Sequence, residues 1–229
     1  MRIIGVRPGG MDMTEALFND LFDEWADHYD ETVFGGHEEY KEVFEGYAGI
    51  LKTVVDALQL PEQSLVLEFG VGTGNLSRLL LKTGYRVIGI EPSEAMRKKA
   101  KEKVPDLELY EGHFLDVPAE IPTVDAIVST YAFHHLPDEM KDRALRELAG
   151  RLNPEGKIVF ADTVFRDEET KRNMQQEAEE RGFHELATDL KREFYPVVSR
   201  LENAFQQAGL TVAFKQLNRF VWLMTAQKA

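Results

Sequence analysis

Apolar residues near the N-terminus recur every three or four positions, which is the spacing of one face of an α-helix. This pattern predicts a helix over residues 14–29 and a second helix over residues 38–60, where Pro61 ends it. The first helix carries an aromatic stripe that consists of Phe18, Phe22, Trp25 and Tyr29. We expect residues 1–60 to form a helical cover that belongs to the same domain as the rest of the chain.

Beyond Pro61, short apolar runs alternate with helical stretches. The predicted strands are 64–69, 86–90, 107–110, 124–129 and 157–161. The predicted helices are 76–83, 93–104 and 138–152, and a turn is expected at 153–156. Strands that are buried on both faces and separated by helices are typical of a parallel sheet with helices on each side.

The C-terminal part combines a charged helical stretch with two more strands. Residues 166–191 form either a surface helix or part of a lid over 166–195, and a helix is predicted over 196–207. Too few residues join the strands at 210–216 and 220–226 for a parallel crossover, so they should pair antiparallel. The predicted fold is α/β: a doubly wound, mostly parallel, seven-stranded Rossmann-like sheet with a C-terminal antiparallel hairpin and an N-terminal helical cover.

The composition narrows the choice of partners and of compartment. The 229 residues include 27 lysines and arginines against 40 aspartates and glutamates, which gives a net charge of −13. A protein that binds by neutralising phosphates needs the opposite sign, so we expect neither nucleic acid nor a membrane as a partner. Cysteine is absent, which excludes disulfides, thiol nucleophiles and cysteine-bound zinc. Because no apolar run is long enough to span a bilayer, we expect a cytoplasmic location.

A glycine-rich loop follows the first strand after Pro61. Gly70, Gly72 and Gly74 occupy alternate positions, which lets the backbone turn sharply and a ligand approach closely. At the end of the next strand, the Glu91 carboxylate can accept hydrogen bonds from both hydroxyls of a ribose. A dinucleotide-binding loop would have its third glycine at the position of Asn75. The compressed spacing therefore favours S-adenosylmethionine, which carries adenosine but no phosphate, over a nicotinamide dinucleotide.

Several segments together resemble a known family. The motifs of class I S-adenosylmethionine-dependent methyltransferases are similar to residues 66–74, 89–96 and 125–136. In detail the chain most resembles the YrrT-like methyltransferases of bacilli, through Trp25-Ala26, Tyr29-Asp30, 40–47 and 160–165. The similarity runs from about residue 22 to the C-terminus, and it implies that 61–229 is an S-adenosylmethionine-binding methyltransferase domain.

The resemblance implies which residues would hold the cofactor. They are Tyr29, Glu68, Gly70, Gly72, Gly74, Glu91, Pro92, Met96, His113, Phe114 and Tyr131. The three glycines would lie against the methionine moiety and the ribose, and Glu91 would bind the ribose hydroxyls. Pro92 and Met96 would flank the adenine, whereas Tyr131 would either form a wall of the pocket or only pack.

One position departs from the pattern of the family. Many relatives carry Gly-Asp-Phe after the third strand, and the acid faces the adenine amino group. This chain has Gly112-His113-Phe114 instead. His113 can still accept a hydrogen bond through one ring nitrogen, or the role passes to Asp116.

Methyl transfer from a sulfonium needs mainly alignment of the reactants and exclusion of water. A general base matters only when the acceptor starts out protonated, and the candidates are Tyr29, His134 and His135. Each histidine has a second interpretation, as a hydrogen-bonded structural residue of its loop. The residues of the lid that could reach inward are Phe183, His184, Phe194 and Tyr195. The scattered histidines show no metal-ligand spacing, so no metal site is expected.

We therefore expect a methyltransferase that acts on a small molecule. The Asn/Asp-Pro-Pro-Tyr motif of nucleic-acid amino methylases is missing, since Ser129-Thr130-Tyr131-Ala132 stands in its place. Two alternatives stay open, a nicotinamide-dependent oxidoreductase and a non-catalytic protein that binds S-adenosylmethionine.

Overall fold

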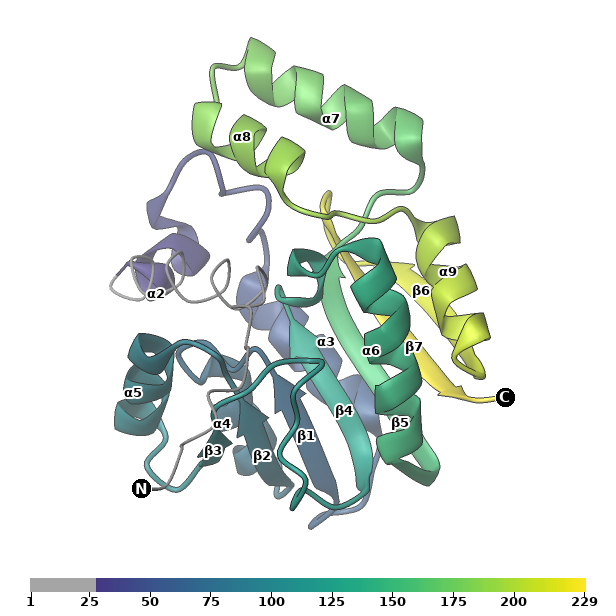
Figure 1. Cartoon of the computed structure of the whole chain (residues 1–229). Helices are drawn as coiled ribbons and strands as arrows, with labels where there is room; N and C mark the ends of the chain where they lie inside the picture. The colour runs from purple at the N-terminus through teal and green to yellow at the C-terminus, as the bar shows by residue number, and fades with distance from the viewer. Residues whose placement is uncertain (1–27) are drawn as a thin grey trace, which may run out of the picture.

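The computed structural model describes residues 28–229, and a seven-stranded sheet forms its centre (Figure 1). The strand order is β3-β2-β1-β4-β5-β7-β6. The strands are β1 (Leu65–Phe69), β2 (Arg86–Ile90), β3 (Glu108–Tyr110), β4 (Val124–Thr130), β5 (Leu152–Thr163), β6 (Leu210–Gln216) and β7 (Val221–Lys228). The first five strands pair in parallel, whereas β7 runs antiparallel to both β5 and β6. The predicted α/β fold, with a mostly parallel sheet and an antiparallel C-terminal hairpin, is confirmed.

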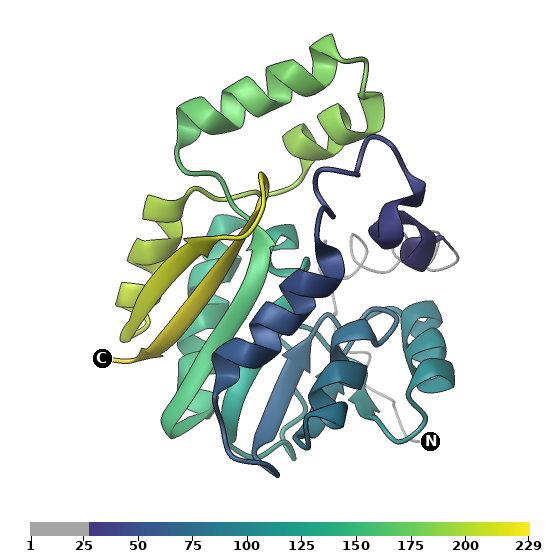
Figure 2. The same cartoon turned by 180° about the vertical axis from the view of Figure 1, so that it is seen from behind.

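Helices cover both faces of this sheet, as Figures 1 and 2 show from opposite sides. One face carries α3 (Tyr47–Leu58), α4 (Asn75–Lys82) and α5 (Glu94–Lys103), and the other carries α6 (Asp138–Arg151) and α9 (Val198–Gln207). Successive strand residues point to opposite faces, so Val66 belongs to one buried core and Leu67 to the other. Within residues 28–229, no helix is both long enough and apolar enough to cross a membrane.

The beginning of β5 differs from the prediction. Val124 pairs with Leu152, and the next paired residues are Ala126 and Lys157. The predicted turn at 153–156 is therefore an irregularity inside the strand, because the chain already pairs with β4 before this point. It is held in place by the Asn153 side chain, which donates a hydrogen bond to Asp125.

The predicted helix over 38–60 begins only at Tyr47. Gly46, immediately before it, has a φ of 72°, a left-handed conformation that a continuous helix excludes. The preceding chain forms α2 (Tyr29–Glu31), a π-helical turn (Thr32–Gly36) and a series of turns. The predicted helix over 14–29 lies outside the described residues except for its last two positions.

The charged segment forms a helical hairpin of α7 (Glu168–Glu180) and α8 (His184–Arg192), which lies above the carboxyl ends of β4 and β5 (Figure 1). The chain turns between the two helices at Gly182, whose φ is 73°. The hairpin contacts the N-terminal segment, where the Glu39 carboxylate accepts hydrogen bonds from the backbone N–H groups of Glu185 and Leu186 in the first turn of α8. We refer to residues 166–195 as the lid segment.

Candidate functional site

Two adjoining cavities lie at the carboxyl ends of the parallel strands. The first cavity is lined by Tyr29, Phe69, Gly70, Gly72, Glu91, Pro92, Met96, His113, Phe114, Thr130, Tyr131, Ala132 and His135. It lies over the ends of β1, β2 and β4, and the order of the strands reverses between β1 and β4. This is the place where open α/β sheets bind their ligands.

The glycine loop and Glu91 form one hydrogen-bonded unit at this cavity. Gly70 and Gly72 have φ values of 66° and 55°, and a Cβ added to Gly70 would lie 2.5 Å from that of Ala132. The backbone N–H groups of Gly72 and Ser93 donate to the two oxygens of Glu91, each at 2.9 Å. The carboxylate is thereby fixed beside a backbone that only glycine can form without strain.

Nine of the predicted cofactor residues line the first cavity: Tyr29, Gly70, Gly72, Glu91, Pro92, Met96, His113, Phe114 and Tyr131. The other two, Glu68 and Gly74, do not line it. Gly74 precedes α4 with a φ of 84°, and a Cβ there would touch Ala100 of α5. Four lining residues were not predicted as cofactor residues. Phe69, Thr130 and Ala132 each directly adjoin a predicted cofactor residue in the sequence, whereas His135 was predicted as a candidate general base.

Glu68 is buried between β1 and α4 and does not line the cavity. Its buried carboxyl accepts a hydrogen bond from the Ser77 hydroxyl of α4, and burial raises its pKa to about 8. A raised carboxyl pKa means that the folded state holds a proton which the unfolded state has released. The stabilising effect of this proton is complete below the unfolded pKa of 4.5, and it is lost progressively as the pH rises from there through the folded pKa of about 8.

The neutral variant Glu68→Gln is therefore expected to be more stable than the parent protein at pH 7, on the order of 3 kcal/mol. Urea unfolding at several pH values between 5 and 8 measures the difference. The gain should shrink toward pH 5, whereas exposed Glu62→Gln should follow the parent protein at every pH. Parallel stability curves for Glu68→Gln and the parent would contradict this expectation.

His113 is oriented by a backbone hydrogen bond. Its Nδ1 accepts the Leu115 N–H at 3.2 Å, so a neutral imidazole carries its proton on Nε2. The second nitrogen then donates a hydrogen bond, which does not suit the predicted role of accepting one from the adenine amino group. Asp116, the other candidate for that role, has an exposed side chain and does not line the cavity.

The N-terminal segment is tied to the glycine loop through Asp30. Its carboxylate accepts hydrogen bonds from Thr73 Oγ1 at 2.6 Å, Asn75 Nδ2 at 3.0 Å and Lys103 Nζ at 2.6 Å. Asn75, the residue that departs from the dinucleotide motif, also accepts a hydrogen bond from Lys103 at 2.8 Å. The network holds Tyr29, which is adjacent to Asp30, against the first cavity.

Asp30→Ala is expected to weaken binding of S-adenosylhomocysteine, the demethylated form of the expected cofactor, by about tenfold. Without the Asp30 carboxylate, Tyr29 is no longer held in place as a wall of the first cavity. We expect this to cost about 1.4 kcal/mol of binding free energy, which corresponds to tenfold in affinity. Calorimetric titration measures the affinity, with exposed Glu31→Ala as the control next to it in the chain. Equal affinities of the two variants would show that this network does not shape the cavity.

The second cavity lies beneath α8. It is lined by Tyr29, Tyr40, Val43, Phe44, Tyr131, His134, His135, Thr163, His184, Glu185, Thr188, Asp189, Arg192, Glu193 and Tyr195. Of the four lid residues predicted to reach inward, His184 and Tyr195 line it. Phe183 packs under the guanidinium of Arg181, and Phe194 is exposed. Both cavities share Tyr29, Tyr131 and His135.

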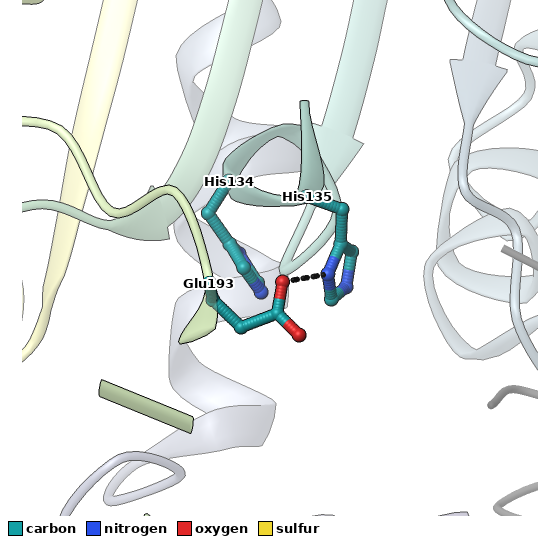
Figure 3. A group of neighbouring side chains, drawn as sticks. All are labelled: His134, His135 and Glu193. Carbon is teal, nitrogen blue, oxygen red and sulfur yellow. Dashed lines mark hydrogen bonds and ion pairs between the residues drawn. The ribbon is translucent and has the colours of Figure 1, made fainter. Parts of the chain in front are cut away.

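The two adjacent histidines each have an acidic partner. His134 Nδ1 lies 2.5 Å from Asp162, and its backbone N–H donates to the same carboxylate. His135 Nδ1 lies 2.9 Å from Glu193, and Figure 3 shows both rings with this glutamate. Burial lowers the pKa of His135, which favours the neutral imidazole.

Tyr131 connects the two cavities in a strained conformation. Its φ is 53°, which is uncommon for a residue other than glycine. Among the described residues, its buried hydroxyl has no hydrogen-bond partner. A strained backbone and an unpaired hydroxyl at the wall of both cavities are typical of a group that meets a ligand.

The structure also brings together a group that the sequence did not predict. Ligand atoms of His134, His135 and Glu193 all lie within 4.8 Å of one another. Glu193 and Asp162 were not among the candidate residues, because each lies far from the histidine pair in the sequence. Only the position of the lid segment and the parallel pairing of β4 with β5 bring them to it.

Comparison with known proteins gives matches to methyltransferases, both from a family model and from individual relatives. A family described as "Methyltransferase domain" matches residues 66–156. The chain is 52% identical to an uncharacterised methyltransferase of a Geobacillus species, over 92% of this chain and 98% of the relative. It is 48% identical to one of Oceanobacillus iheyensis, over 92% of this chain and 97% of the relative.

A solved structure shares the fold at low sequence identity. It is magnesium protoporphyrin IX methyltransferase from Synechocystis PCC 6803 with bound S-adenosylmethionine (SAM). The TM-score is 0.70 at 15% identity, and the match covers 97% of this chain and all of that chain (100%).

Proposed function

The chain belongs to the S-adenosylmethionine-dependent methyltransferases, and from this premise we propose that it methylates a small molecule bound in the second cavity. The observation that carries the proposal is the shared wall of the two cavities, formed by Tyr29, Tyr131 and His135. A cofactor in the first cavity and an acceptor in the second would meet at these residues.

The residues of the first cavity fit this cofactor. Gly70 and Gly72 leave room because they lack Cβ atoms, and the Glu91 carboxylate suits the two hydroxyls of a ribose. Met96 and Phe114 offer apolar contact for the adenine, and the unpaired hydroxyl of Tyr131 offers a hydrogen bond to a polar group. When bound, the cofactor supplies a methyl group already activated on a sulfonium. The chain itself then has to align the acceptor and exclude water.

The second cavity suggests which acceptors fit. Its walls combine aromatic rings with the carboxylates of Glu185, Asp189 and Glu193. Arg192 is the one lysine or arginine among its described lining residues, and it already pairs with Glu193 at 3.5 Å. A neutral or cationic small molecule with an apolar part suits such walls better than a phosphorylated one.

A protic acceptor must also lose a proton. Burial raises the pKa of Tyr29, so its phenol keeps its own proton at neutral pH and is a poor base. His134 and His135 remain the candidates, since each has a carboxylate partner that orients its ring.

Because the chain belongs to this family, the alternative function of a nicotinamide-dependent oxidoreductase has no support. A non-catalytic protein that binds S-adenosylmethionine would differ from the proposed enzyme only in turnover. Turnover is therefore the property to measure.

The test uses methyl-labelled cofactor and a panel of small metabolites grouped by acceptor atom, namely amines, thiols, hydroxyls and carboxylates. We expect labelled product from at least one group, with inhibition by S-adenosylhomocysteine. Glu91→Ala serves as the inactive control. The proposal fails if no metabolite is labelled although the cofactor binds, or if label enters only protein or nucleic acid.

A further inference from the structure

We propose that His134, His135 and Glu193 form a binding site for a divalent transition-metal ion between the two cavities. Each residue offers one ligand atom, and these atoms lie within 4.8 Å of one another. Figure 3 shows the three side chains pointing toward one another. The imidazoles come from the 3₁₀ turn Phe133–His135 after β4, and the carboxylate comes from the chain that follows α8.

The kind of ligand atoms indicates the kind of ion. Two imidazoles and one carboxylate are a donor set that binds zinc with an open position for water or substrate, and related ions such as iron take it too. Calcium and magnesium prefer oxygen ligands alone. We therefore infer Zn²⁺ or a neighbouring first-row ion.

The surroundings of His134 support this assignment. Its Nδ1 is 2.5 Å from Asp162, whose side chain is 4% exposed, so the opposite nitrogen, Nε2, is the one that can bind an ion. Asp162 is itself fixed by the backbone N–H groups of His134 and Thr163. A carboxylate behind a histidine ligand is a regular feature of metal sites, because it fixes the orientation of the ring.

The charges around the group also suit a cation. Glu193 and Asp162 are close to the two rings, and Asp189 lines the same cavity. One oxygen of Glu193 lies 3.5 Å from Arg192, and the other oxygen is hydrogen-bonded to His135 at 2.9 Å. A bound ion would replace this last hydrogen bond. Only small movements of the His135 and Glu193 side chains, which are 14% and 12% exposed, would be needed.

Two consequences follow from the position of the site. The ligands come from the turn after β4 and from the lid segment, so a bound ion would hold the lid segment against the end of the sheet and stabilise the folded protein. A second consequence rests on the proposed function: an ion facing the second cavity would bind an oxygen of the acceptor and favour its deprotonated form. The substrate class would then be small molecules with a hydroxyl at the reacting position.

The test uses full-length protein without a histidine tag, first treated with a chelator and then titrated with Co²⁺. We expect one equivalent of Co²⁺ with visible absorption bands, displacement by Zn²⁺, and a higher melting temperature with either ion. Glu193→Gln and His134→Ala should each weaken binding at least about tenfold, and Asp162→Asn by about 10- to 100-fold. Glu185→Gln is the matched control, because this acid lines the same cavity outside the group.

Binding of S-adenosylhomocysteine to each variant reports whether it is folded. If Glu193→Gln does not fold, His135→Asn takes its place. The metal site is overturned if Co²⁺ gives no bands with protein that binds S-adenosylhomocysteine, or if the affinity for Co²⁺ is the same in all variants. Loss of turnover on every acceptor with metal binding intact would count against the proposed function and not against the metal site.

Discussion

Replacing Glu91 by alanine is expected to weaken binding of S-adenosylhomocysteine by about 100-fold. The Glu91 residue is 4% exposed, and its carboxylate oxygens accept hydrogen bonds from the backbone N–H groups of Gly72 and Ser93. Its removal would take away the acceptor for two ribose hydroxyls and also release the glycine loop. Each hydrogen bond to a charged group contributes about 1.5 kcal/mol or more, so two of them correspond to roughly 100-fold in affinity.

Calorimetric titration measures this loss directly. Glu94→Ala is the matched control, since Glu94 is an exposed acid in the first turn of the helix that follows. Glu91→Gln should lie between the two, because an amide offers a single acceptor oxygen. Unchanged affinity in a folded Glu91→Ala protein would mean that the glycine loop holds the cofactor in some other way.

The first cavity could be predicted because its residues lie in short segments whose positions follow from the local sequence pattern. Each of its main groups comes directly after a strand, and the carboxyl ends of β1, β2 and β4 are neighbours in any sheet of this kind. The strand pattern and the spacing of Gly70, Gly72 and Glu91 therefore carried most of the information. Glu68 and Gly74 were the exceptions. Strand alternation buries the Glu68 side chain against α4 instead of exposing it to a ligand, and Gly74 lies close to Ala100 of α5.

The second cavity depends on contacts between distant parts of the chain, which no local pattern encodes. Glu193 reaches His135 only because α7 and α8 fold back over the strand ends. Asn75 is a second example. Its position, where a dinucleotide loop would have a glycine, argued against a dinucleotide site, but the sequence did not reveal the hydrogen bond that Asn75 donates to Asp30. At the N-terminal end, apolar periodicity continued through residues 38–46, but the left-handed Gly46 makes the helix begin only at Tyr47.

Replacing His135 by alanine is expected to lower turnover by about 10² to 10⁴-fold, with little change in binding of S-adenosylhomocysteine. His135 lines both cavities, and its Nδ1 is held 2.9 Å from Glu193. Burial lowers its pKa, so the neutral ring is available at pH 7 to accept a proton from a protic acceptor. Single-turnover experiments with methyl-labelled cofactor and saturating acceptor measure the rate, and exposed His28→Ala is the control.

The same variant separates two ways in which the histidine can act. If His135 accepts the proton itself, parent protein treated with a chelator keeps its turnover, and only the variant is slow. If His135 acts as a metal ligand, chelated parent protein is as slow as the variant, and added Zn²⁺ restores the parent alone. Full turnover by His135→Ala would contradict both roles, and it would leave alignment at the shared wall as the contribution of the chain to catalysis.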